Sequence, residues 1–74
     1  RQLESIGLHD TPATREYLAN HFAAVATDPT TISMVQQNGR ILRESLLTGP
    51  NGGLKVESVW DGTKLITARF FGGR

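Results

Sequence analysis

Charged and hydroxyl side chains alternate with apolar ones through the second half of the sequence, in a pattern that could bind and cleave RNA. They are Arg43, Ser45, Lys55, Glu57, Thr67 and Arg69. Metal-independent RNA cleavage needs a base for the ribose 2′-OH, an acid for the leaving 5′-oxygen, and cations that stabilise charge on the phosphorane. Arg43, Lys55 and Arg69 would hold the phosphate, the arginines through their bidentate forks. Thr67 would hydrogen-bond a phosphate oxygen.

Two residues are candidates for the general base. Glu57 belongs to the alternating pattern, whereas His21 lies beside the apolar stripe of a predicted helix. A histidine in such a position is more often a half-buried packing residue, and alternating charges are typical of any half-exposed antiparallel sheet. The catalytic face and the merely solvated face therefore both stay open as interpretations.

We expect neither a metal nor a cofactor. The sequence has no Cys, and His9 and His21 lack the spacing of metal ligands. The Gly-Gly pairs at 52–53 and 72–73 lack the strand and helix context of a phosphate loop, so they read as turns. Trp60, beside a predicted hairpin, is either a core or edge aromatic or a base-stacking residue.

Size and charge limit the possible classes of protein. The 74 residues are enough for one domain, residues 1–74, with a thin core. The net charge of +1 and the pI near 8.5 are mildly basic, which is weak evidence for a nucleic-acid partner. No apolar run is long enough to span a membrane. Because the sequence starts at Arg1 without Met, we expect it to be a piece of a longer chain, and its C-terminal part if the resemblance described below holds.

The residues that carry this chemistry must be positioned by helices that precede strands. Thr11 and Pro12 form an N-cap followed by a proline at the first helical position, and an apolar stripe at helical spacing follows as far as Val25. This pattern predicts a helix over residues 12–25. Residues 1–8 resemble the end of a helix that stops at a glycine.

After this helix, the sequence signals change from a helix to turns and strands. Asp28-Pro29 repeats the cap-then-proline signal, and we expect a short helix or turn to about residue 37, ended by Asn38-Gly39. Strands are then predicted over 41–48, 54–60 and 64–71, with a loop at 49–53 and a hairpin turn at Asp61-Gly62.

The register of the last hairpin can be tested by the consistency of its faces. A three-residue loop over 61–63 pairs Val56 with Ala68 on an apolar face, and Glu57 with Thr67 on a polar face. With Leu42 and Leu46 assigned to the apolar side of the first strand, all six polar residues named above share the other face. The predicted fold class is α+β, with N-terminal helices packed on one face of a C-terminal antiparallel three- to four-stranded β-sheet.

The stretch from Leu46 to Phe71, LLTGPNGGLKVESVWDGTKLITARFF, carries a family resemblance. This stretch resembles the C-terminal hairpin of the toxin domains of bacterial polymorphic and contact-dependent growth-inhibition toxins. Those hairpins carry G-x-x-G-x-x-K-V-x-S-x-W-D-G and then a Thr after L-I or L-V. The matching residues are Gly49, Gly52, Lys55, Val56, Ser58, Trp60, Asp61, Gly62 and Thr67. Such domains resemble the barnase–EndoU–colicin D/E5–RelE group of ribonucleases, in which helices precede a curved antiparallel sheet.

The resemblance implies a metal-independent endoribonuclease that leaves a 2′,3′-cyclic phosphate, with tRNA as a frequent substrate in the group. Together with the polar pattern described above, the expected catalytic residues are His21, Arg43, Glu57, Ser58, Thr67 and Arg69, and Lys55 and Trp60 would bind substrate. Ser58 and Trp60 resemble a Ser-x-Trp pair of colicin D. The predicted register places this pair on the face opposite Thr67, and a bulge near residue 58 would bring them together.

The resemblance also implies partners and a location. The toxin would be secreted or delivered from the surface of a bacterium, would act on RNA in the cytoplasm of the target cell, and would be neutralised by an acidic cognate immunity protein. No membrane partner is expected. The alternative is a non-catalytic module that binds nucleic acid or protein through the basic face, with Trp60 as an anchor.

Overall fold

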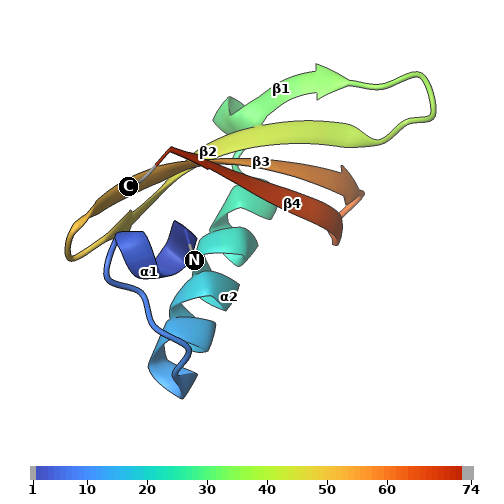
Figure 1. Ribbon diagram of the computed structural model, residues 1–74. Helices are drawn as coiled ribbons and strands as arrows, with labels where there is room; N and C mark the ends of the chain where they lie inside the picture. Colours follow the sequence, from blue (N-terminus) through green and yellow to red (C-terminus); the bar gives the residue numbers. More distant parts are fainter. Residues whose placement is uncertain (1, 73–74) are drawn as a thin grey trace.

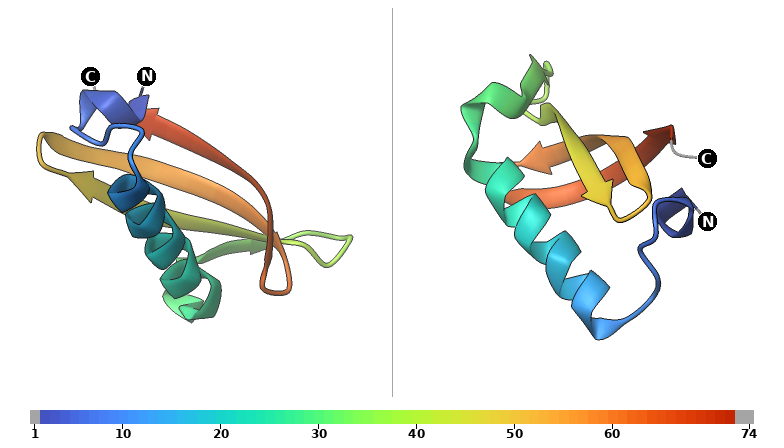
Figure 2. Two further views of the ribbon diagram at one scale, coloured as in Figure 1. Left: turned by 90° about the horizontal axis from the view of Figure 1, so that it is seen from below. Right: turned by 90° about the vertical axis from the view of Figure 1, so that its left-hand side faces the viewer.

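The computed structural model describes residues 2–72. Helices precede strands in the chain, which runs through α1 (Gln2–Ser5), α2 (Pro12–Thr27), the 3-10 helix η1 (Pro29–Thr31), β1 (Ile32–Val35), β2 (Ile41–Gly49), β3 (Gly52–Asp61) and β4 (Lys64–Gly72). The strands form one antiparallel sheet in the order β1-β2-β3-β4, and both α-helices lie on the same side of it (Figures 1 and 2). The predicted α+β class, with helices followed by an antiparallel sheet, is confirmed.

The capping signals of the sequence act as predicted. The Thr11 side chain accepts a hydrogen bond from the backbone N–H of Thr14 at 3.1 Å, and Pro12 is the first residue of α2. At the other end, the Asp28 side chain caps η1 by accepting the Thr30 N–H at 3.0 Å. The helix predicted over 12–25 is confirmed, and it extends to Thr27.

The predicted helix or turn from residue 29 to about 37 is wrong beyond the single 3-10 turn. Ile32–Val35 is a strand that pairs antiparallel with β2, and the Gln36 N–H donates to the Arg40 carbonyl to close the hairpin. Gly39 takes a φ of +85° in this turn, a conformation that favours glycine. The β-branched residues at both ends of β1 agree with a strand, and the cap of η1 hid that signal.

The core lies between the sheet and the two helices. Its fully buried members are Ile6, Leu47, Leu54 and Val56, one from the segment after α1 and three from the central strands. Leu18 and Phe22 of α2 and Phe70 of β4 pack against this cluster. The stripe predicted on the helix therefore faces the apolar side of the sheet, as expected from its spacing.

From Thr67 onward, β4 keeps its predicted faces but changes its partners on β3, whereas Leu65 takes the place opposite Trp60 that was predicted for Lys64. The loop of the β3–β4 hairpin has two residues, so that Asp61 pairs with Lys64, and the register shifts once between Val59 and Trp60. A two-residue loop alone would exchange the faces of β4, and one extra residue at the bulge restores them. As a result Val56 lies opposite Phe70, two residues from the predicted Ala68.

The predicted orientation of β2 is wrong. Arg43 lies opposite Ser58 and Ser45 opposite Val56, so both side chains are on the helix-covered face. Leu46 lies opposite Lys55 on the other face and is 67% exposed. The assignment failed because apolar residues occupy both faces of β2, and polar contacts with the helical segment, described below, decide between them.

The close approach of α1 to the β2–β3 turn gives a test of this packing. A Cβ on Gly49 would collide with the carbonyl oxygen of Ile6, which also accepts the Asn51 N–H at 3.0 Å. We expect Gly49→Ala to lower the free energy of unfolding by about 1–3 kcal/mol, because the buried segment must move. Urea denaturation measures this change.

Gly53→Ala is the matched control, because the nearest atom to a Cβ there is the flexible end of Leu46 at 3.3 Å, and the carbonyl oxygen of Leu47 is 3.5 Å away. Equal destabilisation by the two substitutions would contradict the packing described for α1.

Candidate functional site

The face of the sheet turned away from the helices carries a charged row across three strands. Glu44 of β2 lies opposite Glu57 of β3, which in turn lies opposite Arg69 of β4. Lys55 joins this row, with its Nζ 3.6 Å from Glu44 Oε2 and 4.0 Å from Glu57 Oε2. We call this surface the open face and define it by Glu44, Lys55, Glu57, Thr67, Arg69 and Phe71.

The open face is accessible and adds little to stability. The Lys55 side chain is 54% exposed and that of Glu57 is 27% exposed. Ion pairs with this degree of exposure contribute about 0–1 kcal/mol each, so the fold does not depend on them. The guanidinium carbon of Arg69 lies 5.3 Å from the centre of the Phe71 ring, which puts a cation and an aromatic face side by side. This pairing of groups suits phosphate and base contacts.

The other predicted site residues lie beneath the helices. His21 of α2 reaches Ser45 of β2, with its Nε2 3.0 Å from the hydroxyl oxygen. The imidazole also meets Phe22 edge-on, with ring centres 5.2 Å apart. Burial lowers the pKa of His21 below its ordinary value of 6.5, because the charged form loses solvation. The neutral imidazole is therefore the form that fits this place.

Arg43 connects β2 to the end of α2. Its Nη1 donates to the Asp28 carbonyl oxygen at 2.9 Å and to Thr31 Oγ1 at 2.8 Å, and the side chain is only 6% exposed. Hydrogen bonds from Thr30 lower the pKa of the Asp28 carboxyl below its ordinary value, and attraction to Arg43 adds to this effect. A cation held in this way bonds the helical segment to the sheet and is not free to grip a phosphate.

Ser58 and Trp60 form a buried, hydrogen-bonded pair on the helix-covered face of β3. The indole N–H donates to the Ser58 hydroxyl at 2.9 Å, and Ser58 has no exposed surface. A register irregularity does occur nearby, between Val59 and Trp60, yet both side chains of the pair stay on the helix face. The bulge therefore does not bring them to Thr67, which lies opposite Val59 on the open face.

The predicted site is thus divided between two faces of the sheet. The open face brings together four of its residues, Lys55, Glu57, Thr67 and Arg69. The helix face holds the other four, His21, Arg43, Ser58 and Trp60. A polymeric substrate can reach only the first group, because three of the second group are buried. The interpretation of all eight as one pocket does not fit this arrangement.

Two residues of the open face were not singled out from the sequence. Glu44 sits on the polar side of β2 once that strand is oriented correctly, and Phe71 follows Arg69 at a spacing of two on β4. The period-2 pattern of β4 contains the signal for Phe71, since residues i and i+2 share a face. No signal in β2 alone indicated Glu44.

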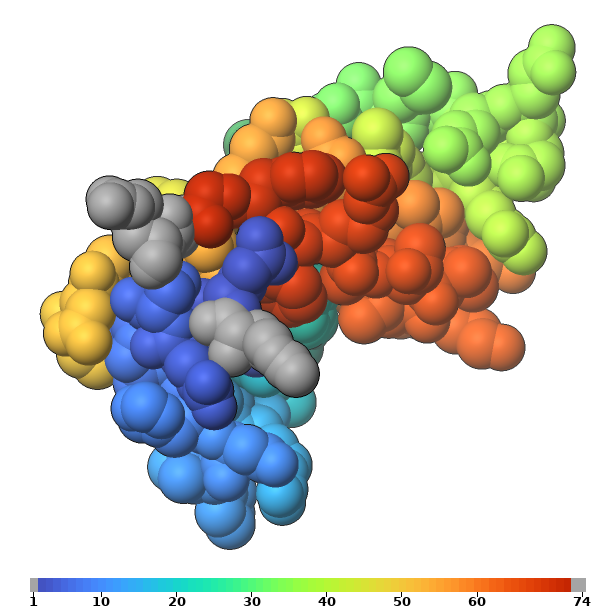
Figure 3. Space-filling view, in the orientation of Figure 1, coloured from blue at the N-terminus to red at the C-terminus, as the bar shows by residue number. Residues whose placement is uncertain are grey.

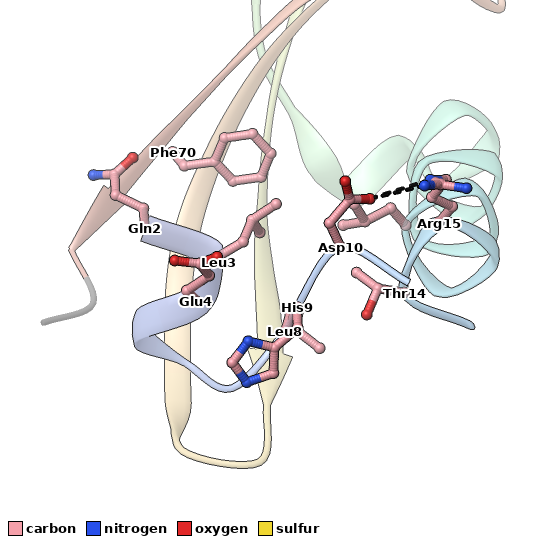
Figure 4. A pocket seen from close by; sticks show the side chains of 10 residues that line it. Gln2, Leu3, Glu4, Leu8, His9, Asp10, Thr14, Arg15 and Phe70 are labelled. Carbon is pink, nitrogen blue, oxygen red and sulfur yellow. Dashed lines mark hydrogen bonds and ion pairs between the residues drawn. The ribbon is translucent and has the colours of Figure 1, made fainter. Parts of the chain in front are cut away.

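A recess lies between α1, the first turns of α2 and the end of β4 (Figure 4). Its volume is about 340 Å³, and Leu3, Leu8, Leu18 and Phe70 supply its apolar lining. Glu4 and His9 also line it, and the ion pair of Arg15 with Asp10, 3.0 Å long, lies on its rim. The apolar part of the lining suits an apolar side chain.

Among residues 2–72 no group of three or more His, Asp or Glu side chains is placed to hold a metal ion. None of the helices in this range is long and apolar enough to cross a membrane. Comparison with protein-family models, curated proteins and solved structures finds no significant match to this chain.

The buried imidazole gives a prediction for stability against pH. In the unfolded chain His21 takes up a proton near pH 6.5, whereas in the folded chain it stays neutral to lower pH. The unfolded state then binds more protons than the folded state. The contribution of His21 to the free energy of unfolding is therefore complete above pH 6.5 and is lost as the pH falls through the folded-state pKa. Urea denaturation between pH 7.5 and 5 measures this fall, and His21→Gln should reduce it.

His9→Gln is the matched control, because His9 is exposed in the loop before α2. An unchanged slope in His21→Gln, or an equal reduction in both variants, would show that His21 is not the group responsible.

Proposed function

We propose that this chain is a toxin domain that cleaves RNA without a metal ion, using the open face of its sheet. One observation carries the proposal: Glu57 lies 4.0 Å from Lys55 Nζ and directly opposite Arg69 on the neighbouring strand, on a surface that the described helices leave uncovered. A carboxylate with two cations as its neighbours on one sheet face supplies a proton acceptor and phosphate-binding groups on the same surface. The family resemblance of the last hairpin supports the same chemistry.

The proposed reaction is an attack of the ribose 2′-oxygen on phosphorus. Glu57 accepts the 2′-OH proton as the new O–P bond forms, and the bond from phosphorus to the 5′-oxygen breaks. Lys55 donates a proton to the departing oxygen, which leaves a 2′,3′-cyclic phosphate and a 5′-OH. Arg69 holds the non-bridging oxygens through two N–H groups, and Thr67 donates a hydrogen bond to one of them.

A base next to the scissile phosphate would stack near Phe71. Stacking on an aromatic ring requires an unpaired base, so single-stranded loops are the expected targets. An anticodon loop of tRNA is such a target and is the first substrate to test. An acidic immunity protein would neutralise the toxin by covering the same cations.

A non-catalytic binding module remains the second candidate. Apolar Phe71 lies among the charges of the open face, and exposed Leu46 lies beside them, opposite Lys55; such a mixture is also typical of a docking surface. The two functions differ in one result. The enzyme turns over RNA at sub-stoichiometric amounts in EDTA and leaves cyclic-phosphate ends, whereas the module binds RNA and leaves it intact.

Glu57→Gln separates the open face from the helix face. This change keeps the size of the side chain and removes the proton acceptor, so we expect RNA cleavage to fall by about 10²–10⁴-fold. Because Glu57 is partly exposed, the free energy of unfolding should change by less than about 1 kcal/mol. Cleavage of labelled tRNA in EDTA, together with urea denaturation, measures both effects.

His21→Gln is the matched control on the helix face, and we expect it to cleave RNA at close to the parent rate when folded. If His21→Gln abolishes cleavage while Glu57→Gln does not, the active site is not on the open face.

A further inference from the structure

We propose that the free edge of β4, together with the apolar recess beside it, docks an extended acidic segment of a partner protein by adding a strand to the sheet. The inference concerns an interaction surface and does not depend on nuclease activity. Three features of the described residues support it, namely the unpaired edge, the charges along it and the recess.

β4 is the last strand of the sheet, and no described strand pairs with its outer side. Lys64–Gly72 is nine residues long, and Figure 3 shows β4 at the surface of the molecule. Such an edge presents unpaired N–H and C=O groups that can pair with another chain. The opposite edge, β1, is less suitable because it has only four residues and an irregular register.

The bulge divides the β4 edge into two parts. A bulge and a nearby lysine are common devices that protect an edge from pairing, and both occur at the beginning of β4, at Ile66 and Lys64. The remaining stretch, residues 67–72, has a regular register with β3. It contains neither a proline nor a bulge, so its backbone is regular enough to pair with an added strand.

Charge decides which kind of strand fits. Lys64 and Arg69 are the charged residues of β4, and the strand contains no carboxylate. A second copy of this chain would bring cations beside cations, which is unfavourable across neighbouring strands. A strand with a carboxylate opposite Arg69 forms a favourable cross-strand pair instead. We therefore assign the edge to an acidic partner segment and not to self-association.

The recess determines what the other face of that segment must carry. Phe70 lies on the helix face of β4 and forms one wall of the recess, with Leu3, Leu8 and Leu18 around it. A strand paired with β4 places every second side chain on this same face, next to Phe70. The recess of about 340 Å³ gives room for a large apolar side chain there. The partner segment is thus acidic on one face and apolar on the other.

A synthetic peptide of about ten residues tests the proposal, with Glu at alternate positions and Val or Leu between them. Its backbone amides are N-methylated on alternate residues, along one edge in the first version and along the opposite edge in the second. Strand addition uses one edge of the peptide only, so one version should bind at least about tenfold more weakly than the unmodified peptide. Binding should slow the hydrogen exchange of backbone amides in β4, measured by NMR on the labelled domain.

Charge is tested on the domain and on the peptide. Arg69→Gln should weaken binding several-fold, whereas Arg40→Gln, which removes the same charge from the exposed β1–β2 turn, should not. A peptide with Lys in place of Glu should not bind. No binding of the acidic peptide at millimolar concentration, equal binding of the two N-methylated versions, or exchange protection at β1 instead of β4 would each overturn the proposal.

Discussion

The hydrogen bonds from Arg43 to the segment that ends α2 determine which side of β2 faces the helices. The guanidinium reaches the Asp28 carbonyl and the Thr31 hydroxyl, and a buried cation must keep such partners because leaving them would cost several kcal/mol. Residues two and four apart in a strand share a face, so with Arg43 on the helix face Leu47 also lies there and enters the core. Leu46 is left on the other face. The faces on which the polar side chains of β2 lie follow from this choice.

Two groups of polar residues result, and their surroundings differ. On the helix face, hydrogen bonds between His21 and Ser45, and between Trp60 and Ser58, satisfy polar atoms within the packed layer. On the open face, Lys55 and Glu57 are partly exposed to solvent, where their attraction contributes little to folding. Groups that the fold does not need, and that a large substrate can reach, are the better candidates for chemistry. The proposed function rests on this contrast between the two faces.

The local signals in the sequence predicted most of the fold. Thr11-Pro12 and Asp28-Pro29 marked two true helix starts, and the three long strands lie where alternation placed them. β1 was not predicted, because it has only four residues, all of them exposed. They follow a helix cap and are too few to show the alternation of a strand. The β3–β4 register was not predicted because the two-residue turn and the bulge each shift the pairing by one residue. Together they shift it by two residues, which leaves the faces beyond the bulge unchanged.

The candidate site was harder to predict than the fold. The residues of β3, and those of β4 from Thr67 onward, were placed on the correct faces, since their alternation is regular there. β2 has leucines on both faces, and its orientation depends on a long-range contact between residues 28 and 43 that no local pattern encodes. Contacts of this kind also decide whether a histidine of a helix, such as His21, faces solvent or the sheet.

The most direct test of the division between the two faces is an NMR titration of the labelled domain with an RNA that cannot be cleaved. A single-stranded oligonucleotide with 2′-O-methyl riboses lacks the attacking hydroxyl and still presents its phosphates. The account predicts chemical-shift changes that centre on Lys55, Glu57, Thr67 and Arg69, with His21 and Ser45 unaffected. Changes that centre on His21 and Ser45, with the open face silent, would contradict it.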